Sequence, residues 1–310
     1  MTTRFDALTR PKTGDDPSAP SRLRPIGFGA AAIGVLAVVI ALVANVAAAN
    51  SATETGATFA WSFGLTVLGF GTVKLAIGLI LVGILTQIWH RAASVEDACA
   101  RLRPHVEAPL PRGTVQTEFG ECTETATAPG PLPIHRMART MWFPMLAMGY
   151  MLVVVGFVLS LVWAGKVDDG TQQAAQAWTQ GVQFLGEGLL LAGISFLLGS
   201  ILAALRESGG RVQESLGLPV RTLKMPKTAK LFVGFMAIGL MVSMVQLVLY
   251  AVAAAVGDPQ SFAAWSAWLG PFREVGLGLL LAGVVLALVT IGNVLAFQFA
   301  RVREIIATGK

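Results

Sequence analysis

Six long apolar runs divide this chain of 310 residues and constrain its fold more than any other feature. Each run can cross a hydrocarbon core of about 30 Å as a helix that rises about 1.5 Å per residue. Open strands leave backbone groups unpaired in lipid, so we expect the spanning segments to be helices. The runs cover residues 27–49, 61–89, 141–165, 178–205, 231–256 and 271–300.

Composition supports this reading. Charged residues make up 13% of the chain and hydrophobic residues 54%, whereas a soluble domain carries about 25% charged residues. The net charge of +5 does not indicate nucleic-acid binding, because the basic residues flank the apolar runs, where they face lipid headgroups. The sequence therefore predicts an all-α polytopic membrane protein with the lipid bilayer as its partner.

The distribution of Lys and Arg predicts the orientation. Five lie in the N-terminal tail, six in the second loop, six in the fourth loop and three at the C-terminal end. The remaining three are Lys74, Lys166 and Arg273. Because positive residues stay on the cytoplasmic side, both termini are expected there. An Ala/Gly/Arg-rich composition suggests a bacterial plasma (inner) membrane.

These assignments define an expected organisation. The first run could alternatively belong to a cleaved signal peptide, but it is longer than the apolar part of such a segment. Loop 91–140 is rich in Pro, Thr and Glu at its centre, which predicts a solvated linker. The helices expected at 61–89 and 178–205 are predicted to continue beyond the membrane. We expect a disordered cytoplasmic tail at 1–25, helical hairpins at 26–90, 141–205 and 231–304, cytoplasmic loops at 91–140 and 206–230, and a cytoplasmic tail at 305–310.

A short sequence motif recurs in the second helix of each expected hairpin and predicts an internal repeat. It begins with glycine, continues through four apolar residues and ends on a second glycine. The second and third units match at a constant offset of 90 residues. Three parallel two-helix repeats in a pseudo-threefold bundle follow as the simplest arrangement. We expect the glycines to pack helices rather than to line a pore; they are Gly78, Gly83, Gly188, Gly193, Gly278 and Gly283.

A few polar residues fall at membrane depth, where each charge costs roughly 2.5–3.5 kcal/mol on insertion scales. We expect Lys74 to pair with Glu187 near the outer face, either as a structural lock or as a ligand or ion site. Arg273 and Glu274 also fit the first turn of a helix that begins at Pro271. The candidate cluster comprises Lys74, Gln180, Gln183, Glu187, Arg273 and Glu274.

Signals for catalysis are absent from the sequence. The three histidines and two cysteines lie at helix ends or in loops without metal-ligand spacing. No phosphate-binding loop or nucleophile elbow is present. We expect no enzymatic activity, no catalytic residues, no metal and no cofactor.

Two functions remain at this point. One is a structural or accessory subunit that packs against a membrane-protein partner or a second copy of itself. The alternative is a small-solute or ion transporter or channel with its polar site near the outer face. The inner halves of the helices are almost wholly apolar, which favours the first function.

Overall fold

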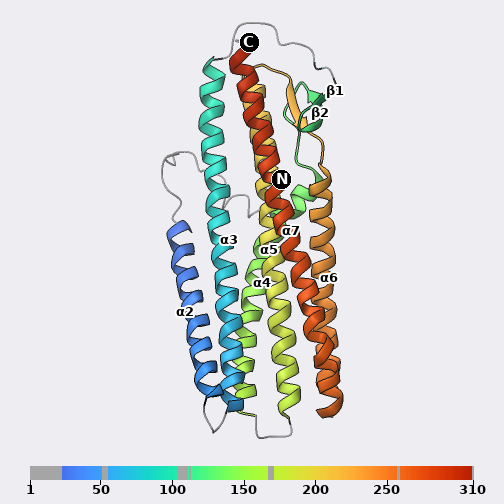
Figure 1. Cartoon of the computed structure of the whole chain (residues 1–310). Helices are drawn as coiled ribbons and strands as arrows, with labels where there is room; N and C mark the ends of the chain where they lie inside the picture. Colours follow the sequence, from blue (N-terminus) through green and yellow to red (C-terminus); the bar gives the residue numbers. More distant parts are fainter. Residues whose placement is uncertain are drawn as a thin grey trace.

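The computed structural model describes residues 23–50, 55–102, 111, 113–166, 171–256 and 259–308. Six helices in this part of the chain are long and apolar enough to cross a membrane (Figure 1). This confirms the prediction of a largely helical protein whose helices suit a membrane. The helices are α2 (Leu23–Ala49), α3 (Thr55–Leu102), α4 (Pro133–Ala164), α5 (Gln172–Ser215), α6 (Lys227–Ala255) and α7 (Pro259–Thr308).

The helices differ in length in a regular way. The first helix of each consecutive pair has 27, 32 or 29 residues, and the second has 48, 44 or 50. At about 1.5 Å per residue the longer helices exceed 60 Å, about twice a hydrocarbon core. They project together beyond the shorter helices at one end of the bundle (Figure 1). We call this the sheet end, and the opposite end, where each pair turns, the hairpin end.

These helices extend past several predicted boundaries. Helices α3 and α5 continue beyond their apolar runs to Leu102 and Ser215, as expected from the sequence. Helix α7 continues to Thr308, so the tail predicted at 305–310 is helical as far as that residue. Of the tail predicted at 1–25, residues 1–22 lie outside the described part of the chain, and α2 begins at Leu23.

Helix α5 occupies the centre of the bundle and packs against α3, α4, α6 and α7. In its most apolar 18-residue window, 94% of residues are buried, against 39% for α3 and 28% for α7. A pseudo-threefold bundle would give these three helices equivalent surroundings. The structure does not show that arrangement, since one of the three is a core helix and the other two lie at its sides.

Each consecutive helix pair crosses at a glycine from both helices. A Cβ atom on the first glycine would lie 2.6, 2.9 or 3.0 Å from the carbonyl oxygen of the second. Such distances leave no room for a side chain, and small residues let helix backbones approach closely in lipid. The pairs are Gly34 with Gly69, Gly149 with Gly186, and Gly239 with Gly276.

The six glycines chosen from the repeat have different surroundings. A Cβ on Gly78, Gly188 or Gly193 would lie within 3.0 Å of a neighbouring helix, and one on Gly283 would make ordinary contact at 3.6 Å. Gly83 is buried. The packing role of Gly278 stays a prediction, because a Cβ there meets nothing within 4 Å among the described residues of the chain. Gly188, which occupies the equivalent position in α5, faces neighbouring helices because α5 is surrounded by other helices, whereas α7 lies at the edge of the bundle.

A small antiparallel sheet joins the two loops at the sheet end. Strand β2 (Gly120–Thr125) lies between β1 (Thr114–Thr117) and β3 (Val220–Leu223). The prediction of a solvated linker is therefore wrong for this part of 91–140. The third strand of the sheet, β3, pairs with β2 and lies about 100 residues later in the chain. Its first residue, Val220, is fully buried.

Candidate functional site

The predicted polar cluster contains a buried three-residue ion pair, which we call the ion triad. Lys74 Nζ of α3 donates to Glu187 Oε1 of α5 at 2.8 Å. Arg273 Nη2 of α7 donates to Glu187 Oε2 at 3.0 Å. The Glu187 side chain is 4% exposed, whereas those of Lys74 and Arg273 are 19% and 20% exposed. Both carboxylate oxygens thus have a cationic partner.

The surroundings of the triad compensate for its extra positive charge. The Arg273 guanidinium carbon lies 3.6 Å from the ring centroid of Phe184, which is within cation–π range. Glu274 Oε1 lies 3.7 Å from Arg273 Nε. With Glu274 included, two positive and two negative residues make the cluster neutral.

The other members of the predicted cluster are less closely associated. Gln183 is fully buried one turn from Glu187, but both atoms of its amide lack a hydrogen-bond partner among the described residues. It packs so closely against Gly156 of α4 that a Cβ at that glycine would collide with its side chain. Gln180 is only partly buried. The structure thus brings Lys74, Glu187 and Arg273 together and leaves the two glutamines outside the ion triad.

The expected helix start at Pro271 is wrong. Helix α7 begins at Pro259, and Pro271 lies inside it. The residue before Pro271 is Gly270, which has no Cβ to clash with the proline ring and so removes one of the steric costs of a proline inside a helix. Glu274 is therefore an exposed residue within the helix, with 69% of its side chain accessible, and not a first-turn residue at the dipole.

Ionic contacts missed by the sequence analysis hold the sheet against the long helices. Arg221 Nε of β3 contacts Glu124 Oε1 of β2 at 2.6 Å, and its Nη1 contacts Glu304 Oε2 of α7 at 2.9 Å. Burial acts to lower the pKa of Arg221, but the hydrogen bond that Arg221 donates to Glu124 and the nearby Glu304 carboxylate outweigh burial, and the pKa is raised. The Arg221 backbone N–H also donates to Gln213 Oε1 of α5 at 3.0 Å.

A second ionic group surrounds Trp89 where α3, α4 and α5 leave the apolar region. Arg139 contacts Glu207 at 2.7 Å, and Arg211 lies 3.9 Å from both Glu207 and Glu96. Arg139 and Arg211 lie 5.5 and 5.2 Å from the Trp89 ring centroid. The sequence analysis used these arginines only to predict the orientation in the membrane, because each has an ionic partner that is distant in the sequence.

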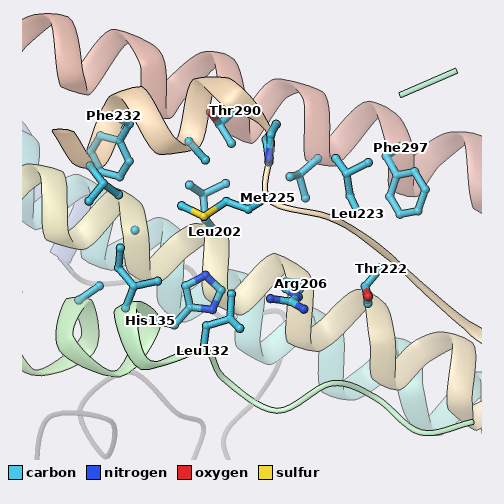
Figure 2. A pocket seen from close by; sticks show the side chains of 18 of the residues that line it. Leu132, His135, Leu202, Arg206, Thr222, Leu223, Met225, Phe232, Thr290 and Phe297 are labelled. Carbon is cyan, nitrogen blue, oxygen red and sulfur yellow. The ribbon is translucent and has the colours of Figure 1, made fainter. Parts of the chain in front are cut away.

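A cavity of about 120 Å³ lies near the sheet end. Residues of α4, α5, α6, α7 and β3 line it, and Figure 2 shows His135 and Arg206 among them with Phe232 and Phe297. The sequence carries no local signal for this cavity, because its walls come from five separate elements. Among the described residues, no group of three or more His, Cys, Asp or Glu could hold a metal ion.

The six long apolar helices found in the described part of the chain place it among membrane-embedded proteins. Comparison of the chain with models of protein families, with curated proteins and with solved structures finds no match.

Proposed function

We propose that this chain is a structural or accessory subunit of a membrane assembly, and that the ion triad locks its three helix pairs together. Lys74, Glu187 and Arg273 come from the second helix of each pair, so one carboxylate links all three pairs. A transported ion or solute would have to compete with two cations already bound to that carboxylate.

The apolar core of α5 is the observation that carries this proposal. Between Gly188 and Leu205 the buried residues of α5 are apolar or small, apart from Ser195 and Ser200. The large aliphatic residues of this stretch belong to one continuous core with α3, α4, α6 and α7. A solute path needs polar groups or water along its length. Those aliphatic residues include Leu190, Leu191, Ile194, Leu197, Leu198 and Ile201.

One observation favours the alternative, a small-solute or ion transporter or channel. The amide of Gln183 is buried and unpaired, and such groups are normally satisfied by a protein partner, water or ligand. A single amide next to a closed ion triad does not make a route across the bundle, so we place this function second.

The proposed setting follows from charge. The excess of Lys and Arg toward the sheet end favours a cytoplasmic position for that end and for both termini. We infer a bacterial plasma membrane from composition. We also infer that the chain has no enzymatic activity, metal or cofactor of its own, and that its partner is another membrane protein or a second copy of the chain.

Purification in mild detergent and reconstitution into liposomes test the proposal together. We expect a stable complex of fixed stoichiometry, measured by light scattering and native mass spectrometry, and no solute or ion flux above empty liposomes. A monodisperse single chain that passes a solute would contradict it, provided that Gln183→Leu abolishes the flux and Gln180→Leu does not.

A further inference from the structure

The cavity at the sheet end follows one face of α5. Its α5 residues recur at intervals of three or four, which places them on one stripe. The stripe spans 19 residues, or about 27 Å of helix, so the lining is elongated along α5. Its α5 lining includes Ser195, Gly199, Leu202, Arg206, Gly209 and Gln213.

The cavity lies between α4 and α6, with α5 behind it. Its α4 lining includes Ile134 and Ala138, and its α6 lining includes Ala229 and Phe232. In the described part of the chain α4 and α6 do not pack extensively against each other. A ligand could therefore enter sideways from the lipid as well as from the end of the bundle.

The ionisable residues that line the cavity are all basic. Among the described residues, its lining contains His135, Arg206 and Arg221 and no acidic residue. Arg221 is already paired with Glu124 and Glu304. Arg206 differs, because its buried Nε has no hydrogen-bond partner among the described residues. An unpaired buried donor on a charged group is costly, and a carboxylate or phosphate oxygen is its natural acceptor.

The adjacent groups support an anion at this position. Figure 2 shows the imidazole of His135 and the guanidinium of Arg206 as neighbours on one side of the cavity. Either neutral tautomer of His135 carries one N–H donor, so the histidine can contribute without being charged. Glu207, the next residue of α5, contacts Arg139 and Arg211 and does not line the cavity.

Most of the remaining lining of the cavity is apolar. Phe196, Phe232, Met236 and Val294 are among the apolar residues that line it. One hydroxyl there, that of Ser195, is buried without a partner, but an unpaired hydroxyl costs less than an unpaired charged group. A single water needs roughly 10–15 Å³, so a cavity of about 120 Å³ holds much more than one water.

We propose that this cavity binds an acidic amphiphile from the adjacent leaflet, with its phosphate at Arg206 and His135 and its acyl chain along the apolar stripe of α5. A free phosphate would satisfy Arg206 but leave the apolar part empty. The site is distinct from the ion triad, since Arg206 lies 19 residues, or about 28 Å of helix, from Glu187.

Native mass spectrometry of the purified, delipidated full-length chain tests the proposal. The probes are phosphatidylglycerol, phosphatidylcholine with the same acyl chains, and inorganic phosphate. We expect phosphatidylglycerol to bind at least tenfold more tightly than either of the others. Arg206→Gln should weaken its binding at least tenfold, whereas the matched control Arg303→Gln, at an exposed position of α7 outside the cavity, should change it less than twofold.

A second variant keeps the proposal testable if Arg206→Gln does not fold. Ala229→Leu fills the apolar part, leaves Arg206 in place and should also weaken phosphatidylglycerol binding severalfold. Equal binding of the two lipids, equal effects of the two arginine variants or an unchanged affinity in Ala229→Leu would overturn the proposal. Phosphate binding as tight as that of phosphatidylglycerol would assign the site to a free anion instead.

Discussion

Glu187 is the residue on which the buried charges of the bundle depend. Glu187→Gln would leave the ammonium of Lys74 and the guanidinium of Arg273 without their common counter-charge. Removing one partner of a buried ion pair costs about 3–5 kcal/mol, so we expect a loss of that size in the free energy of unfolding. Reversible unfolding in mixed detergent and dodecyl sulfate micelles measures it.

The neighbouring carboxylate provides the control for this prediction. Glu274 is 69% exposed and lies 3.7 Å from Arg273 Nε, so Glu274→Gln should cost no more than about 1 kcal/mol. The double variant Lys74→Gln/Glu187→Gln should lose less than the sum of the single variants, because their contributions are coupled. Additive losses would show that Lys74 does not interact with Glu187 in the membrane.

Two glycines from different copies of the repeated motif should differ in how replacement by alanine changes the free energy of unfolding. A Cβ at Gly193 would lie 2.9 Å from the backbone nitrogen of Leu146, and backbone atoms cannot easily move aside. Gly193→Ala should therefore destabilise by about 1–3 kcal/mol. Gly278→Ala meets nothing and removes a flexible residue from a helix, so it should be neutral or stabilise by up to about 1 kcal/mol. The same unfolding measurement compares them, and equal losses would contradict the prediction.

At the scale of the element, the three-stranded sheet depends on Arg221. Arg221→Gln removes the ion pair with Glu124, whose side chain is 3% exposed, and the contact with Glu304 of α7. We expect the sheet to open at a cost of about 2–3 kcal/mol, which makes amide exchange of residues 114–125 tens to a hundredfold faster. Hydrogen–deuterium exchange with mass spectrometry measures this.

The matched control lies in the same strands and their ends. Lys224 contacts Glu121, and the two side chains are 49% and 41% exposed. Lys224→Gln should leave exchange in the sheet nearly unchanged, because exposed pairs contribute at most about 1 kcal/mol. If both variants accelerate exchange equally, Arg221 has no special role.

The sequence predicts the membrane helices well because their signals are local. Length, hydropathy and the absence of charge within each run depend only on consecutive residues. The charged residues Lys74 and Glu187 were visible for the same reason, since a charge in an apolar run needs a partner. The sheet was not predictable in this way, because β3 lies about 100 residues from β2 and each strand alone has only four to six residues.

Three-dimensional neighbours also decide what a repeated motif does. Gly188 and Gly278 occupy equivalent places in the repeated motif, yet one faces Ser243 and the other faces no protein atom. Phe184 could not be recognised from its sequence context as the ring beneath Arg273. Such contacts depend on which helix is central, whereas the sequence repeat is the same in α3, α5 and α7.

At the scale of the whole molecule, the central position of α5 links the ion triad to the sheet end. The same helix supplies Glu187, the apolar core, Arg206 and the amide of Gln213 that binds β3. The paired hydrogen bonds between Gln213 and the backbone of Arg221 attach the sheet directly to this helix. The extensive packing of α5 against four other helices is consistent with the structural role proposed above.

The orientation of the whole molecule gives the last prediction. Cys99 is partly exposed near the sheet end of α3, whereas Cys122 is fully buried in β2. If the sheet end is cytoplasmic, a membrane-impermeant maleimide should label Cys99 only after cells are permeabilised. Thr171 is exposed at the hairpin end, so Cys99→Ser/Thr171→Cys should be labelled on intact cells, and Cys99→Ser alone should not. Labelling of Cys99 on intact cells, with Thr171→Cys protected, would reverse the orientation inferred from the distribution of Lys and Arg.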